Sequence, residues 1–142
     1  MTYTGEVSVG GGAQERELGG LSVTKVAVDE QMSNNAYLLR CRATGEQLLI
    51  DAAAEAETLL ELVGDGGLAT VVTTHQHWDH VRALEETAAA FSSTTQAGED
   101  DADALPLAPD VRLQHGDTVT FGDITLDVIH LRGHTPGSVA LA

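Results

Sequence analysis

The stretch that decides the fold is Thr-Thr-His-Gln-His-Trp-Asp-His, residues 73–80 of the 142-residue chain. It places three imidazoles and one carboxylate among neighbouring positions. In an extended chain, residues two apart point to the same side, so His75 and His77 can converge on one metal ion. We expect a helix to begin near Asp79, so that Asp79 and His80 project from a different backbone direction toward a second metal.

A second cluster lies downstream, at residues 133–138, with the sequence Gly-His-Thr-Pro-Gly-Ser. Glycine and proline constrain such a loop, so His134 can be held at a fixed angle. His134 could complete a three-histidine set with His75 and His77 and leave a fourth position for water, which is typical of a catalytic metal site. Imidazole and carboxylate ligands suit zinc, and also iron or manganese.

The two clusters resemble the motifs of the metallo-β-lactamase superfamily. Residues 75–80 are similar to its H-x-H-x-D-H signature, and residues 133–138 to its G-H-T-x-G-S loop. The resemblance runs from about Leu21 to Ala142 and is nearest to the glyoxalase II-like branch, whose members hydrolyse thioesters. Three further residues fall where the early strands of the family carry such residues: Asn35, Tyr37 and Asp51.

The resemblance implies a ligand set and a fold. The first metal would be held by His75, His77 and His134, and the second in part by Asp79 and His80. Asp79 would also act catalytically, because it would orient the attacking hydroxide that the metals generate. The fold would be α+β, a four-layer αββα sandwich with up to two zinc ions at one edge of its two sheets.

The chain departs from the family pattern in several places. The family's metal-bridging Asp and a further His ligand lie downstream of the Gly-His-Thr loop, and the chain ends before either. We therefore expect a fragment with an incomplete second half that binds one zinc better than two and shows little hydrolase activity. Arg82 and Ala83 stand where glyoxalase-type members have Gly-Gly. His130 keeps the family spacing, and we expect it to play a structural or supporting role.

The leading functional hypothesis is a metal-dependent hydrolase that uses a metal-bound hydroxide to cleave a thioester, lactone or similar small acyl substrate. One alternative is a mononuclear iron persulfide dioxygenase, which occurs on the same scaffold, and another is an inactive metal-binding fragment. A diiron flavoprotein-type site is disfavoured, because Gln76 stands where that branch commonly has a Glu ligand. A nuclease is disfavoured by the charge of the chain.

The chain carries 22 acidic and 7 basic residues, which gives a formal net charge of −15. Nucleic acids and anionic membranes attract clustered Lys and Arg, so we expect neither as a partner. The single cysteine, Cys41, excludes an internal disulfide and is predicted to be a buried structural thiol. We find no signal-peptide pattern or apolar membrane span, and we expect a cytoplasmic location. The sequence leaves the oligomeric state open.

Glycine-rich residues 1–20 are predicted to be a flexible lead-in, and residues 21–142 the domain. Apolar spacing predicts helices at residues 52–63 and 81–91. Residues 92–105 are expected to form a short strand and then a solvated acidic loop, and His115 to lie in an exposed turn. The predicted strands are Leu21–Val28, 35–42, Gln47–Ile50, 68–73, Val111–Leu113, Thr118–Phe121, 124–129 and a last one beginning in 138–142.

Overall fold

The computed structural model describes residues 13–28, 34–74, 81–131 and 138–142. Its helices are α1 (Ala56–Val63) and α2 (Leu84–Phe91), with 3₁₀ turns η1 (Gly64–Gly66) and η3 (Glu99–Ala104). Its strands are β1 (Gln14–Leu18), β2 (Leu21–Val28), β3 (Asn34–Cys41), β4 (Gln47–Ile50), β5 (Thr70–Thr73), β6 (Thr94–Gly98), β7 (Val111–Leu113), β8 (Thr118–Phe121), β9 (Ile124–His130) and β10 (Val139–Leu141).

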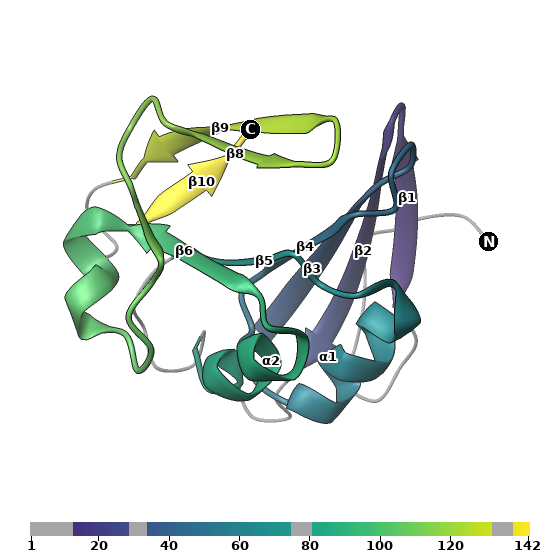
Figure 1. The fold of residues 1–142 in the computed structure, drawn as a ribbon, viewed down its shortest axis with the longest axis horizontal. Helices are drawn as coiled ribbons and strands as arrows, with labels where there is room; N and C mark the ends of the chain where they lie inside the picture. The colour runs from purple at the N-terminus through teal and green to yellow at the C-terminus, as the bar shows by residue number, and fades with distance from the viewer. Residues whose placement is uncertain (1–12, 29–33, 75–80, 132–137) are drawn as a thin grey trace.

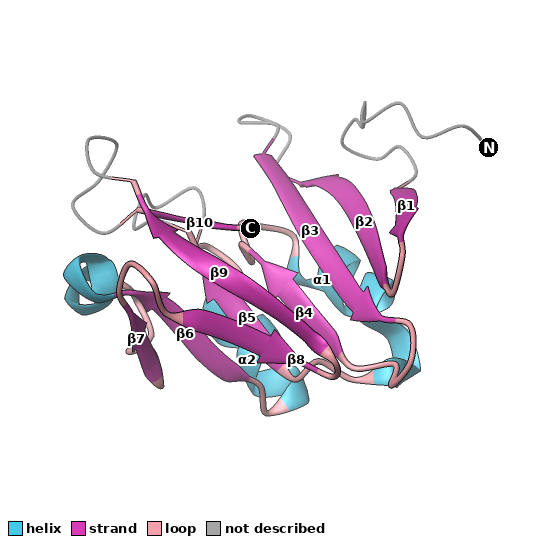
Figure 2. Ribbon diagram, turned by 90° about the horizontal axis from the view of Figure 1, so that it is seen from above, coloured by secondary structure: helices cyan, strands magenta, loops and turns pink. Residues whose placement is uncertain are grey.

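Within these residues the strands form two sheets (Figures 1 and 2). The larger sheet has seven strands in the order β1 to β7, antiparallel from β1 to β4 and parallel from β4 to β7. The smaller sheet has the antiparallel order β10-β9-β8. Because β4, β5 and β6 are parallel, their carboxyl ends lie at one edge of the large sheet, and the predicted ligand segment 75–80 follows β5 at that edge.

The layers follow from side-chain alternation along the central strands, since successive residues of a strand point to opposite faces. Leu38, Leu49 and Val71 belong to the core beneath α1 and α2, whereas their neighbours Leu39, Leu48 and Val72 belong to the core between the two sheets. Figure 1 shows the two helices on one face of the large sheet and the small sheet on the other. The described residues therefore supply three layers, α, β and β, of the predicted αββα sandwich.

Both helices begin later than their apolar spacing predicts. The first was expected from residue 52, but Asp51 and Glu55 have left-handed backbone angles (φ 62° and 54°) that interrupt a helix. The second was expected over residues 81–91, but α2 begins at Leu84, and the expected helix start near Asp79 lies outside the described residues. The amides of Arg82 and Ala83 instead donate to the carbonyls of Ala53 and Ala52 at 3.1 and 3.0 Å.

Two segments predicted to be irregular are ordered. Residues 14–18, placed in the flexible lead-in, form β1, which pairs along its whole length with β2 through the Gly19-Gly20 turn. The acidic residues after β6 form η3 rather than a solvated loop. Asp101 within it is 1% exposed, because the turn directs this side chain into the protein.

Several predictions are confirmed. Four strands have the predicted bounds: β2, β4, β7 and β8. Cys41 is buried, and its sulfur accepts a hydrogen bond from the amide of Asp123 at 3.4 Å. Apart from these predictions, no helix in the described part of the chain is long and apolar enough to cross a bilayer.

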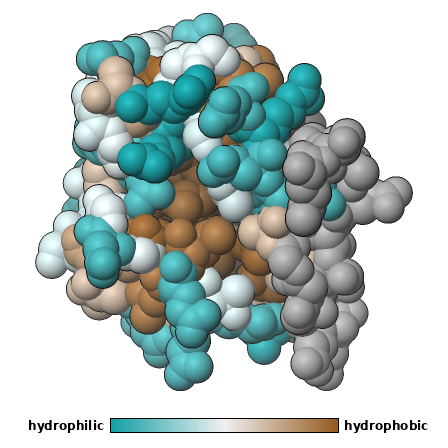
Figure 3. Space-filling view, turned by 90° about the vertical axis from the view of Figure 1, so that its right-hand side faces the viewer, coloured by the Kyte–Doolittle hydropathy of each residue, from teal (hydrophilic) through white to brown (hydrophobic). Residues whose placement is uncertain are grey.

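The core between the sheets is open on one side. Its partly buried members include Leu21 and Val23 of β2 and Tyr37 of β3 on the large sheet. Figure 3 shows a hollow of hydrophobic side chains, framed by hydrophilic ones, on the face that lies to the right in Figure 1.

The β8–β9 turn closes onto the β3–β4 turn at Gly122. This residue has a left-handed φ of 55°, and a Cβ added to it would lie 2.7 Å from the sulfur of Cys41 and would also clash with the hydroxyl of Thr44. Glycine is therefore needed for both its backbone angle and its small size.

We predict that Gly122→Ala destabilises the protein by about 2–4 kcal/mol, from overpacking added to left-handed strain. The matched control is Gly19→Ala, where φ is 61° but an added Cβ would have nothing within 4 Å, so about 1 kcal/mol is expected. Denaturant unfolding of both variants measures the difference. Equal losses would contradict the close approach at Gly122.

Candidate metal centre

Asp51 joins the carboxyl ends of β4 and β5. Its backbone amide donates to the carbonyl of Val72 at 2.9 Å, and its carboxylate accepts two hydrogen bonds from Thr74. The Thr74 amide donates to Oδ1 and the Thr74 hydroxyl to Oδ2, each at 2.7 Å. Asp51 is 6% exposed, so these bonds lie largely out of water, where hydrogen bonds to a charged group are strong.

The structure brings together the ends of the two segments that carry the predicted ligands. Thr74 is the last described residue before 75–80, and its carbonyl accepts a hydrogen bond from the amide of Val139 at 2.9 Å. Val139 follows the segment 132–137, whose ends are joined by a 2.8 Å bond from the Leu131 amide to the Ser138 carbonyl. The residue before the first motif and the residue after the second are therefore hydrogen-bonded neighbours, although they are distant in sequence.

The other end of segment 75–80 is also fixed. Val81 is buried, and the hydrogen bonds of Arg82 and Ala83 tie the chain to the segment that follows Asp51. The residues on both sides of the histidine-rich segment are therefore hydrogen-bonded to the connection from β4 to α1.

The five predicted ligands themselves lie outside the described residues: His75, His77, Asp79, His80 and His134. Their assignment, and the catalytic role of Asp79, remain predictions. The donor set of four imidazoles and a carboxylate fits zinc or iron chemically. Among the residues that the structure describes, no group of three or more His, Cys, Asp or Glu side chains is arranged to hold a metal, so no competing centre is found there.

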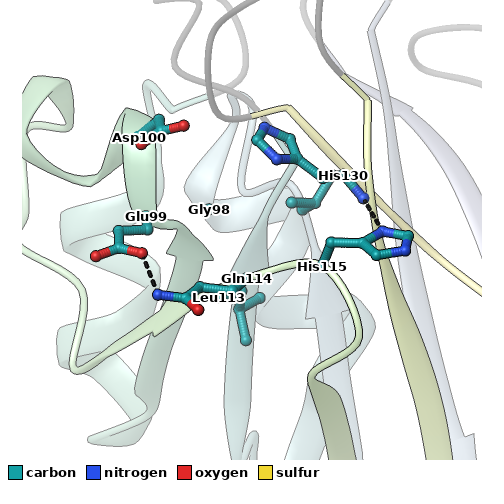
Figure 4. A pocket seen from close by; sticks show the side chains of 8 residues that line it. Gly98, Glu99, Asp100, Leu113, Gln114, His115 and His130 are labelled. Carbon is teal, nitrogen blue, oxygen red and sulfur yellow. Dashed lines mark hydrogen bonds between the residues drawn. The ribbon is translucent and has the colours of Figure 1, made fainter.

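A cavity of about 330 Å³ lies where the two sheets approach each other at this edge (Figure 4). Gly98, Glu99 and Asp100 line it from the end of β6 and the start of η3. Gln114 and His115 line it from the turn after β7, and His130 from the end of β9. As predicted, His115 is exposed in a turn, and its Nδ1 accepts a hydrogen bond from the His130 amide at 3.1 Å.

The acidic side of this cavity has a neighbouring cation. Arg112 binds Asp103 at 2.7 Å, and this hydrogen bond, with the attraction of the two charges, lowers the pKa of Asp103 and raises that of Arg112. Glu99 raises the pKa of Arg112 further through its charge. Glu99 itself accepts a short hydrogen bond from the side-chain amide of Gln114.

Comparison with known proteins places the chain in a family. The model of the metallo-beta-lactamase superfamily matches residues 30–142. A hydroxyacylglutathione hydrolase of Fuscovulum blasticum is 37% identical over 108 residues, which cover 75% of this chain and 42% of that protein. The chain spans 64%, 42% and 40% of the length of three curated relatives that it matches.

Solved structures agree with this match. The crystal structure of ETHE1 from Myxococcus xanthus superposes with a TM-score of 0.74 at 27% identity, covering 84% of this chain and 52% of that one. TTHA1623, solved in a di-iron-bound form, gives a TM-score of 0.69 at 29% identity over 83% of this chain and 65% of that one.

The chain belongs to the metallo-β-lactamase superfamily, whose members bind metal ions such as zinc and iron and are mostly hydrolases. The predicted fold class is confirmed, and so is the resemblance to the glyoxalase II-like branch. Sequence reasoning did not assign the clamp between Asp51 and Thr74. An Asp that ends a buried strand, in a chain whose next strand ends in Thr-Thr-His, was the available signal.

We predict that Asp51→Asn weakens metal binding about ten- to a hundredfold, because groups that orient the ligand-bearing backbone contribute on that scale. It should also cost about 1–3 kcal/mol of stability, since a charged acceptor of two buried hydrogen bonds is lost. Competition with a chelating dye measures the affinity, and denaturant unfolding the stability.

The control is Asp110→Asn. Asp110 forms a similar clamp, with Oδ2 accepting from the Thr95 amide at 2.9 Å, but between β6 and β7 and with an exposed side chain. Its loss should leave metal affinity unchanged. A similar loss of affinity in both variants would contradict the role of Asp51.

Proposed function

We propose that this chain carries the metal centre of a hydrolase that cleaves a thioester, lactone or similar small acyl substrate. The observation that carries the proposal is the hydrogen bond between Thr74 and Val139, which joins residues that flank the two segments predicted to bind metal. The 37% identity to a hydroxyacylglutathione hydrolase supports a thioester as the substrate.

The proposed ligands are His75, His77 and His134 for a first metal, and Asp79 and His80 for part of a second. Zinc is the proposed metal, and iron or manganese would also suit these ligands. Bound metal would supply Lewis acidity, which lowers the pKa of a water molecule and stabilises negative charge on the acyl oxygen. Asp79 would orient the attacking water.

The chain's own framework has a defined part in this chemistry. The clamp from Asp51 to Thr74 and the bond from Val139 to Thr74 hold residues that flank the segments of the proposed ligands. Fixing ligands before substrate arrives avoids reorganisation during the reaction. With a net charge of −15, we propose no nucleic-acid or membrane partner.

An iron-dependent persulfide dioxygenase is the second candidate. The structural likeness to ETHE1 from Myxococcus xanthus, at a TM-score of 0.74, favours keeping it. The two functions differ in metal and in co-substrate, because the dioxygenase consumes molecular oxygen and the hydrolase consumes water.

We predict that the metal-free chain gains a low level of thioester hydrolysis when zinc is added, and that one zinc binds more tightly than a second. The first metal position has three proposed ligands in this chain, whereas the second has two. His77→Ala should reduce hydrolysis at least about a hundredfold. Zinc titration with thiol release from a hydroxyacylglutathione thioester measures both.

The control is Glu57→Gln, which removes an exposed carboxylate on α1 and should leave the rate unchanged. Oxygen uptake with a persulfide and bound iron, without thioester hydrolysis, would favour the dioxygenase. Absence of hydrolysis with zinc, iron and manganese alike would overturn the hydrolase proposal for this chain.

A further inference from the structure

The end of β9 is held by a side chain where its neighbour β8 no longer runs alongside it. In antiparallel pairing, the amides of alternate residues point to the same neighbour. The Val128 amide donates to the carbonyl of Asp117 at 2.8 Å, and the Val128 carbonyl accepts from the amide of Gly116 at 3.0 Å. The next amide on this side of β9 belongs to His130, and it donates to Nδ1 of the His115 ring at 3.1 Å (Figure 4). An imidazole therefore continues the ladder of main-chain bonds by one step.

This step lies directly before the downstream motif. His130 pairs with Val139 of β10, on the side of β9 opposite to the imidazole. The next residue, Leu131, donates its amide to the carbonyl of Ser138 at 2.8 Å, which joins the ends of segment 132–137. The imidazole bond therefore fixes the strand position from which the chain enters that segment.

The bond also requires one protonation state of the His115 ring. A ring nitrogen accepts a hydrogen bond only when it carries no proton, so His115 is the neutral tautomer with its proton on Nε2. A protonated ring would direct an N–H at the amide N–H of His130, and the bond would be lost. Among the described residues, the other ionisable side chains of the same cavity wall are Glu99 and Asp100 on η3 and His130 on β9, and Asp117 follows in the turn of His115.

We propose that neutral His115 is a positioning residue for the candidate metal centre, because it fixes the end of β9 that leads to the proposed ligand His134. The inference rests on the proposed metal centre and adds to it a residue that lies in neither motif. A ligand segment that is held before the metal arrives need not be ordered on binding, which raises metal affinity. The same bond makes this hold sensitive to acid, since one proton on His115 removes it.

Two substitutions separate the acceptor from the charge. His115→Asn keeps an acceptor atom at the side-chain position of Nδ1 but does not titrate, whereas His115→Phe keeps a planar ring without an acceptor. Amide hydrogen exchange in the metal-free chain reports protection at His130, Leu131 and Val139. At about pH 7.5 we expect His115→Phe to lose about two- to fivefold protection at all three amides, since an exposed hydrogen bond contributes modestly. His115→Asn should retain the protection of the parent chain.

The parent chain tests the same bond without a substitution. A histidine ring ordinarily changes its charge between about pH 5 and 8. After correction for intrinsic exchange rates, protection in the parent at about pH 5.5 should fall to the level of His115→Phe, while His115→Asn keeps its protection. Equal protection in the Asn and Phe variants would overturn the inference. A loss confined to the His130 amide would also overturn it, because the bond would then have no effect on segment 132–137.

The matched control is Gln114→Ala. Gln114 is the neighbouring residue in the same turn and lines the same cavity, but its side chain bonds to Glu99 rather than to β9. Its loss should leave exchange at the three reporter amides unchanged. The same loss of protection in Gln114→Ala and His115→Phe would attribute the effect to the turn as a whole and would overturn the role of the imidazole.

Zinc affinity links the bond to the metal centre, and competition with a chelating dye measures it. His115→Phe should bind the first zinc about two- to fivefold more weakly than His115→Asn. Protonation of the proposed ligands lowers affinity in every variant, so it cancels in the ratio of two variants at one pH. Equal affinities in the two variants would overturn the positioning role. Absence of zinc binding in all variants, with the expected exchange pattern retained, would count against the proposed function and not against the hold of His115 on segment 132–137.

Discussion

The structure depends most on the pair of hydrogen bonds by which Asp51 holds Thr74. Asp51 follows β4 and Thr74 follows β5, which are neighbouring strands of the large sheet. The Asp51 carboxylate therefore fixes the position of the backbone at the point where the chain leaves β5, just before segment 75–80. The left-handed backbone of Asp51, φ 62°, turns the chain away from a helix at this point. Such strain persists where surrounding contacts over-determine it, and it gathers at functional sites. Here it allows one side chain to serve both the fold and the predicted metal centre.

The second constraint is that the small sheet brings the downstream motif back to the first. Chain order alone separates segments 75–80 and 132–137 by more than fifty residues. Two antiparallel pairings, β8 with β9 and β9 with β10, return the chain so that Val139 reaches Thr74. The core residues Val119, Phe121 and Val128 hold these strands against the large sheet. The predicted metal centre therefore depends on how the two sheets pack, although its predicted ligands are recognisable in the sequence.

The electrostatic character of the site follows from local placement rather than from net charge. A chain of net charge −15 has acidic side chains on much of its surface, and most of them are expected to be solvated. Glu99 and Asp100 differ because η3 follows directly after β6, at the sheet edge where the ligand segments also lie. Their neighbour Asp101 is directed into the protein instead. A short 3₁₀ turn thus divides consecutive acids between a cavity wall and the interior.

The sequence by itself determined the family, the fold class and the identity of the candidate ligands, because two short motifs with defined spacing carry that information. It also predicted the strands whose apolar residues alternate or run together, such as β2 and β4. It did not determine where the helices begin, since backbone angles at Asp51 and Glu55 and the bonds from Arg82 and Ala83 override apolar spacing. Only the tertiary structure decided that Asp51 clamps Thr74 and that Glu99, Asp100 and His130 line one cavity. These contacts join residues from different strands and turns, and periodicity within a segment holds no information about its neighbours in space.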